Sequence, residues 1–97
     1  MTQQNLFLGI DCGTQGTKAI VLDATSGKVL GLGAAAHTLI SGANGRREQD
    51  TQQWLNAFTD ATHRALQQAG VDGQAILGIG VSGQQHGLVL LDDSGHV

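Results

Sequence analysis

The sequence is short of several features that define whole classes of protein. Cys12 is the single cysteine, which excludes an internal disulfide and a cluster of thiolate metal ligands. Only five Lys and Arg residues occur, and they are scattered, so no nucleic-acid partner is expected. No apolar run approaches the length of a membrane span, and residues 1–5 lack the charge and apolar core of a signal peptide. A cytoplasmic protein without a membrane partner is therefore expected.

What is present is a small globular composition with unusually many glycines. An apolar content of 40% and a net charge of -3 in 97 residues suit one small domain with a modest core. Glycine occurs 15 times, about twice the usual frequency of roughly 7%. Several of these glycines interrupt strand-like apolar runs, where glycine marks bulges or a close approach of two backbones.

Residues 9–18 combine a carboxylate, two glycines, two threonines and a final lysine. Apolar runs at residues 6–10 and 19–22 predict two strands, so residues 11–18 should form the tip of a hairpin. Glycine allows a backbone to approach a ligand closely, and consecutive peptide N–H groups in such turns can bind an anion. The carboxylate would repel phosphate by itself, but it suits a magnesium ion with its bound waters. The candidate phosphate-binding residues are Gly13, Thr14, Gly16, Thr17 and Lys18, with Asp11 as the metal-binding residue. An ordinary glycine-rich turn, with Lys18 in solvent, is the alternative.

The rest of the sequence predicts an α/β fold. A turn at residues 23–27 leads to a third strand at residues 28–34 that runs on toward residue 39, which completes an antiparallel meander. Residues 40–49 read as a surface loop. Asp50 is a good helix N-cap and Gly70 a good C-cap, with apolar residues at helical spacing between them. These apolar residues are Trp54, Leu55, Phe58, Ala61, Ala65, Leu66 and Ala69.

The C-terminal quarter predicts a buried strand at residues 76–81, parallel to the first strand after the helical crossover. A further strand at residues 88–91 and a turn at residues 92–95 follow. The sequence ends where a returning strand would begin, so we expect a longer protein. Between the two strands, residues 82–87 contain two Gln and a His, whose donors and acceptors suit a polyhydroxylated ligand. A polar surface loop is the alternative.

Residues 9–18 resemble the first phosphate motif of the FGGY carbohydrate kinases, which have the ribonuclease H-like fold of the actin and hexokinase ATPase superfamily. Residues 48–50 followed by Trp54, together with residues 80–87 and 90–92, are similar to the xylulokinases within that family. The resemblance covers nearly all 97 residues but only the opening part of such a kinase. It implies that residues 1–97 are the N-terminal part of the first domain, the sugar-binding half with the first phosphate loop.

The resemblance also implies roles for individual residues. Asp11 would engage Mg²⁺ through water, while Thr14, Gln15 and Gly16 would approach the phosphates of ATP and Lys18 would face phosphate. Gln85 and His86 align with the pair that contacts the sugar. The implied reaction transfers the γ-phosphoryl group of ATP to the 5-hydroxyl of D-xylulose, which gives D-xylulose 5-phosphate.

The general base implied for this reaction is an Asp far beyond residue 97, and the adenosine-binding segment is absent too. We therefore expect residues 1–97 alone to have no kinase activity. Another FGGY kinase, acting on gluconate, glycerol or ribulose, is an alternative. An actin-like ATPase domain that handles no sugar is a second, and a homodimer of the full-length protein stays open.

Overall fold

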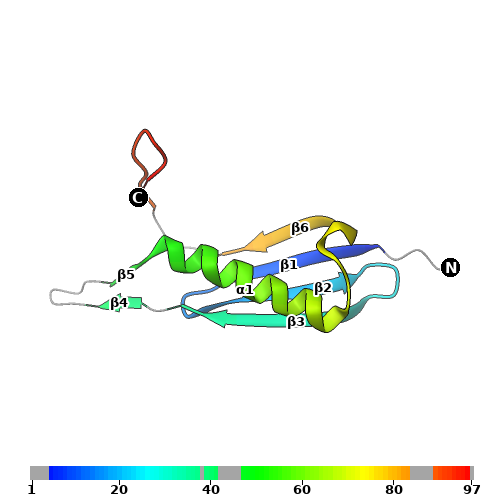
Figure 1. The fold of residues 1–97 in the computed structure, drawn as a ribbon. Coiled ribbons are helices and arrows are strands. Elements are labelled where there is room, and N and C mark those ends of the chain that lie inside the picture. The colour runs from blue at the N-terminus through cyan, green and yellow to red at the C-terminus, as the bar shows by residue number, and fades with distance from the viewer. Residues whose placement is uncertain (1–4, 38, 42–46, 84–88, 97) are drawn as a thin grey trace.

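The computed structural model describes residues 5–37, 39–41, 47–83 and 89–96 (Figure 1). Its main sheet contains β1 (Leu6–Cys12), β2 (Gly16–Asp23), β3 (Lys28–Ala36) and β6 (Ile76–Ser82), in the order β3-β2-β1-β6. The first three strands are antiparallel, and β6 runs parallel to β1. Helix α1 (Thr51–Ala69) and the short 3-10 turn η2 (Gly73–Ala75) form the crossover between β3 and β6. The predicted meander, helix and parallel strand are therefore confirmed.

Three boundaries differ from the sequence prediction. The first hairpin is tighter, because Asp11 pairs with Lys18 and Cys12 with Thr17, which leaves only residues 13–16 between the last paired residues. The predicted loop at residues 40–49 contains two short paired strands, β4 (Leu39–Ser41) and β5 (Arg47–Gln49). Residue 88 lies outside the described residues, and residues 89–91 form no strand, because in the described part of the chain no neighbouring strand pairs with them.

Helix α1 begins and ends where its capping residues predict. The Asp50 carboxylate accepts a hydrogen bond of 2.9 Å from the backbone N–H of Gln52, as an N-cap should. At the other end Gly70 has a φ of 71°, and its N–H donates to the carbonyl oxygens of Leu66 and Gln67. Glycine is favoured here because a left-handed conformation strains residues that carry a Cβ.

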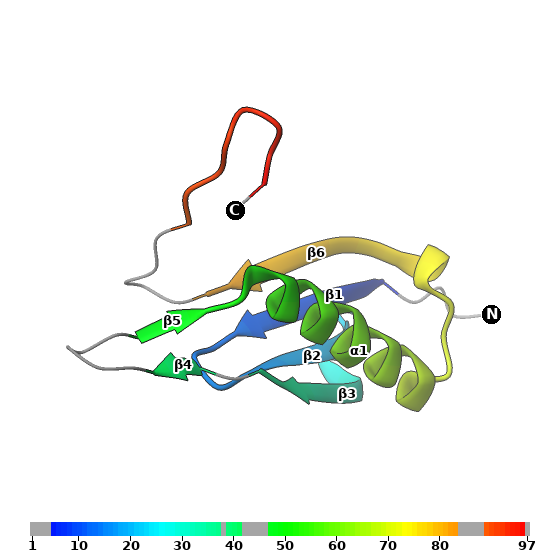
Figure 2. The ribbon, with the colours of Figure 1, turned by 60° about the vertical axis from the view of Figure 1, so that its left-hand side comes forward.

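The helix lies across one face of the sheet, mainly over β3 and β2 (Figure 2). Its fully buried residues are the alanines Ala57, Ala61 and Ala65, so the helix approaches the sheet closely. Leu55 was predicted to belong to this face, but it is 61% exposed. The core beneath the helix consists of Leu8, Ile10, Ala19, Val21, Ala61 and Ala65.

Gly31 and Gly33 on β3 make this close approach possible. A Cβ added at Gly33 would overlap the carbonyl oxygen of Ala61 and lie 2.7 Å from the Ala65 nitrogen. A Cβ at Gly31 would overlap the carbonyl oxygen of Ala65. Because the atoms in the way belong to the helix backbone, no side-chain movement can relieve the overlap.

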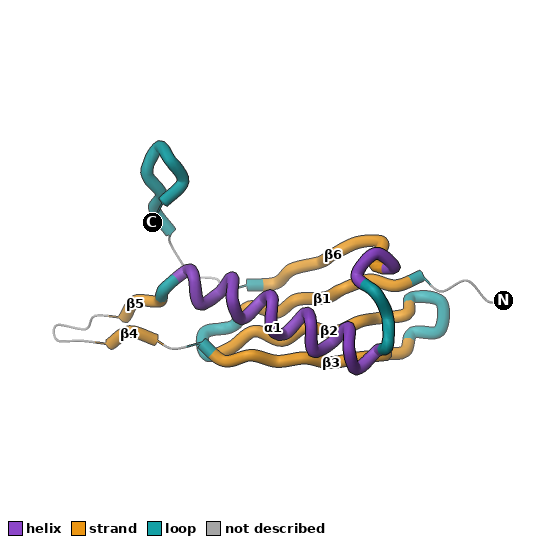
Figure 3. The backbone as a smooth tube through the Cα atoms, viewed as in Figure 1, coloured by secondary structure: helices purple, strands orange, loops and turns teal. Residues whose placement is uncertain are grey.

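The two edge strands of the main sheet, β3 and β6, differ in how far other elements cover them (Figure 3). On β3, the backbone N–H of Leu32 donates to Gln68 and the carbonyl of Ala34 accepts from Arg64, so the helix covers this edge with hydrogen bonds. On β6, Leu77, Ile79 and Val81 are 64%, 59% and 68% exposed. The prediction that this strand is buried is therefore wrong within this chain, because α1 extends over β3 and β2 and no described element packs over β6.

No helix in the described ranges is both long enough and apolar enough to cross a membrane.

We expect Gly33→Ala to lower the free energy of unfolding of the full-length protein by about 2 kcal/mol or more, because overpacking against a fixed backbone typically costs about 1–3 kcal/mol. Urea unfolding measures the change. Gly80→Ala is the matched control, since a Cβ at this other strand glycine meets nothing within 4 Å. Equal effects of the two substitutions would contradict the close packing of α1 on β3.

Candidate functional site

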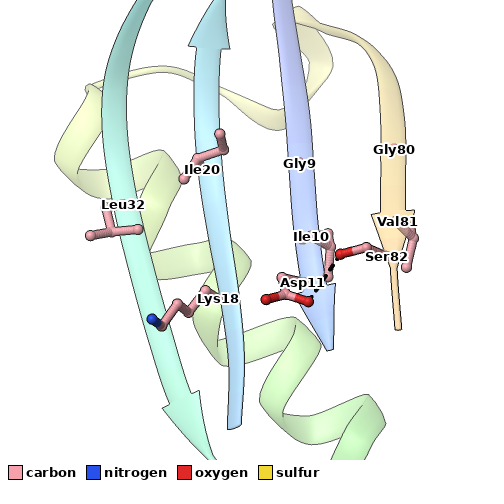
Figure 4. Close-up of a pocket in the computed structure, with 9 residues that line it drawn as sticks. All are labelled: Gly9, Ile10, Asp11, Lys18, Ile20, Leu32, Gly80, Val81 and Ser82. Atoms are coloured by element: carbon pink, nitrogen blue, oxygen red, sulfur yellow. Dashed lines mark hydrogen bonds between the residues drawn. The ribbon is translucent and has the colours of Figure 1, made fainter. Parts of the chain in front are cut away.

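The carboxyl ends of β1 and β6 bring together the two polar segments that the sequence singles out. Asp11 near the end of β1 is in register with Ser82 at the end of β6. Strands β1 and β6 are parallel, so paired residues point to the same face of the sheet. The Ser82 hydroxyl donates a hydrogen bond of 2.9 Å to Asp11 Oδ1, across 71 residues of sequence (Figure 4). The end of a parallel strand is a common position for ligand contacts in open α/β sheets.

A shallow groove of about 520 Å³ lies beside this hydrogen bond. Most of its strand residues, among them Asp11, Lys18 and Ile20, alternate with the buried residues of the core, so the groove lies mainly on the face of the sheet opposite α1. Lys18, the cross-strand partner of Asp11, lines the groove, and among the described residues it makes no ion pair. The groove is lined by Gly9, Ile10, Asp11, Lys18, Ile20, Leu32, Gly80, Val81 and Ser82.

Two glycines open the groove next to Asp11. Gly9 and Gly80 are register partners on β1 and β6, two residues before Asp11 and Ser82, so they lie on the same face. A Cβ at Gly9 would lie 3.1 Å from Cγ1 of Ile20, whereas a Cβ at Gly80 would meet nothing within 4 Å. The Ile20 side chain therefore packs close to Gly9, whereas the backbone at Gly80 is open and lets a ligand come close to the sheet.

The turn after β1 is exposed and held by backbone hydrogen bonds. The N–H of Gly13 donates to the carbonyl of Gly16 at 2.9 Å, and the carbonyl of Gln15 accepts from the N–H of His37 at 3.1 Å. The Gly13 N–H is thus directed across the turn. Thr14 and Gln15 are exposed at the tip, where a ligand can reach them.

Gly16 packs tightly against β3. A Cβ at this position would lie 3.0 Å from the carbonyl oxygen of Ala35. Positive φ values in the described part of the chain occur at Gly27, Gly70 and Gly95, so neither Gly13 nor Gly16 adopts the left-handed conformation. The small size of Gly16, and not a special backbone conformation, therefore favours the close start of β2 beside β3.

Thr17 lies apart from the other candidate phosphate-binding residues. Its side chain is 1% exposed, on the face of β2 that also carries Ala19 and Val21 beneath α1. Its Oγ1 has no hydrogen-bond partner. The prediction that Thr17 offers a hydroxyl to a phosphate does not fit this burial, because the hairpin is tighter than predicted and alternation turns Thr17 inward.

Gln85 and His86 lie outside the described residues. Ser82 is the first residue of the polar segment 82–87 that the sequence singles out, but sequence reasoning gave it no individual role. Its position at the end of a strand predicted to run parallel to β1 could have pointed to a role in the site. The register that pairs it with Asp11 appears only in the structure.

The donor set suits a magnesium ion held through water. Asp11 is exposed, and among the described residues one of its oxygens accepts from Ser82 while the other has no hydrogen bond. No group of three or more His, Cys, Asp or Glu side chains in the described ranges could hold a metal ion. Mg²⁺ commonly keeps several waters and binds one or two carboxylates plus substrate phosphates, so a single carboxylate beside a phosphate-binding turn fits it.

Comparisons with known proteins agree with this geometry. Residues 6–97 match the N-terminal domain of the FGGY family of carbohydrate kinases. A xylulose kinase from Haemophilus influenzae is 54% identical in an alignment of length 91 that covers 90% of this chain and 18% of that protein. The structure of a xylulose kinase from Brucella ovis superposes with a TM-score of 0.86 at 34% identity, over 95% of this chain and 19% of that one.

The structure of a gluconate kinase from Lactobacillus acidophilus also superposes, with a TM-score of 0.83 at 26% identity, over 96% of this chain and 18% of that one. The chain therefore spans about a fifth of the length of these proteins. Their agreement with the mixed sheet confirms the predicted actin-like fold.

We expect Thr17→Val in the full-length protein to leave the KM for ATP within about twofold and the stability unchanged or slightly higher, because it replaces a buried hydroxyl that has no partner. Thr14→Val, which removes an exposed hydroxyl at the tip of the turn, should raise that KM. Steady-state kinetics with varied ATP tests both. A rise caused by Thr17→Val as large as that caused by Thr14→Val would contradict the inward orientation of Thr17.

Proposed function

Because the chain belongs to the FGGY family of carbohydrate kinases, we propose that the full-length protein transfers the γ-phosphoryl group of ATP to the 5-hydroxyl of D-xylulose. One observation carries the proposal: β1, which leads into the phosphate-type turn, and β6, which precedes Gln85 and His86 in the sequence, are parallel neighbours that end side by side. Phosphoryl transfer depends chiefly on alignment and electrostatic stabilisation, so two binding segments must meet at one place.

On the nucleotide side, we assign Gly13, Thr14, Gln15 and Gly16 to the phosphates of ATP. Thr14 and Gln15 are exposed at the tip of the turn, which supports this assignment. Lys18 contributes a positive charge beside the groove.

Asp11 would hold Mg²⁺ through water and orient it toward the phosphates. When bound, Mg²⁺ neutralises negative charge on the phosphoryl group that is transferred. The carboxylate itself carries no assigned proton transfer, because the family resemblance implies a general base beyond residue 97.

On the sugar side, we assign Gln85 and His86 to hydroxyl groups of the substrate. Amide and imidazole groups both donate and accept hydrogen bonds, which matches a sugar. A gluconate kinase is the second candidate, because a solved gluconate kinase has a closely similar fold over this region. Cytoplasmic location and a homodimer stay predictions.

A panel of D-xylulose, D-ribulose, gluconate and glycerol, each assayed with ATP and Mg²⁺, tests the substrate. We expect kcat/KM for D-xylulose to exceed that for each other substrate by at least about tenfold, since discrimination by polar contacts to hydroxyls is strong. Higher kcat/KM for gluconate would support the second candidate, and ATP hydrolysis without any sugar phosphorylation would contradict both.

We expect Asp11→Asn to lower kcat by about 100-fold or more, because loss of a few kcal/mol of transition-state stabilisation has this effect. The KM for D-xylulose should stay within about threefold, since Asp11 is assigned to the metal. Asp60→Asn is the matched control, an exposed carboxylate on α1 away from the groove. An equal loss of sugar affinity in Asp11→Asn would contradict the assignment of Asp11 to the metal.

A further inference from the structure

We propose that Ser82 is a positioning residue for this reaction, whose hydroxyl holds the Asp11 carboxylate in its working orientation. This inference rests on the function proposed above, because it concerns the same site. It gives an individual role to the first residue of the polar segment 82–87, for which the sequence pattern alone specified none.

The hydrogen bond from Ser82 distinguishes the two carboxylate oxygens of Asp11. Ser82 Oγ donates to Oδ1 at 2.9 Å, and the second oxygen lies on the side of the groove that faces Lys18 (Figure 4). A carboxylate has about four lone-pair sites, so one donated hydrogen bond leaves the other oxygen free to orient a metal-bound water. The arrangement therefore fixes the carboxylate without using up its capacity to bind.

Few other groups restrain Asp11. It is exposed, and the neighbouring positions on its face of β1 and β6 are Gly9 and Gly80, which have no side chains to pack against it. Its cross-strand partner Lys18 makes no ion pair in the described part of the chain. Within the described part of the chain, Ser82 is therefore the side chain that holds the carboxylate in one orientation.

Orientation matters in this chemistry because a displacement of about 1 Å can cost about 100-fold in rate. Hydrogen bonds to charged groups are also stronger than those between neutral groups. Both partners are exposed, so water can replace the hydrogen bond at little cost to the stability of the fold. We therefore expect loss of the serine hydroxyl to affect turnover more than stability.

The test uses Ser82→Ala, Ser82→Thr and Ser82→Cys in the full-length protein. We expect Ser82→Ala to lower kcat about tenfold, with the KM for D-xylulose within about twofold. Ser82→Thr keeps the hydroxyl and should restore kcat to within about threefold of wild type. Ser82→Cys has nearly the size of serine but is a weak donor, so it should behave as Ser82→Ala even if the alanine variant folds poorly.

A binding measurement separates this role from a structural one. We expect Ser82→Ala to weaken the affinity for a non-hydrolysable ATP analogue several-fold when Mg²⁺ is present and to leave it unchanged when Mg²⁺ is absent. Ser26→Ala is the matched control, because Ser26 Oγ donates a similar hydrogen bond of 3.0 Å to Asp23 Oδ2, in the turn between β2 and β3. It should change neither kcat nor the Mg²⁺-dependent affinity.

A double-mutant comparison completes the test. In an Asp11→Ala background, Ser82→Ala should lower kcat by less than about twofold, because its target is already gone. The inference is overturned if Ser82→Ala leaves an active enzyme unchanged, or if it lowers kcat equally with and without Asp11. A wild-type protein that phosphorylates no sugar would instead overturn the proposed function, and the inference with it, so the two failures give different results.

Discussion

The parallel pairing of β1 with β6 is the constraint on which the candidate site depends. It places Asp11 beside Ser82, although they are 71 residues apart in the sequence. Parallel neighbours need a long crossover, and here α1 and η2 provide it. A shift of this register by one residue would turn Ser82 to the other face of the sheet and separate the two segments.

The crossover itself depends on how closely α1 approaches the sheet. Gly31 and Gly33 let the alanine face of the helix contact the backbone of β3, and Arg64 and Gln68 then satisfy the edge of that strand. The opposite face of the sheet carries the groove, in which the backbone at Gly80 is open. Glycines therefore allow the helix to pack closely on one face of this sheet and leave room for a ligand on the other.

Local patterns predicted the elements that local chemistry controls. The caps of α1 followed from Asp50 and Gly70, because each satisfies backbone groups within a few residues of itself. The β4 and β5 strands were missed because each is three residues long and carries no sustained alternation. The apolar run of β6 indicated burial, but burial depends on a covering layer that this chain does not supply in its described part.

The candidate site was predicted in part. Asp11, Thr14 and Gln15 stood out by residue type and resemblance, and the structure places them at an exposed strand end and turn. The inward orientation of Thr17 follows from simple alternation once the hairpin is tight, but the sequence alone suggested a longer tip. The Asp11–Ser82 contact depends on the register between distant strands, which no local pattern specifies.

The most direct measurement is a crystal structure of the full-length protein with Mg²⁺, a non-hydrolysable ATP analogue and D-xylulose. We expect the phosphates beside residues 13–16, a magnesium-bound water on the Asp11 oxygen that Ser82 does not engage, and the sugar beside His86. Phosphates bound away from residues 13–16, or a metal with no water-mediated contact to Asp11, would contradict a site built where β1 and β6 end.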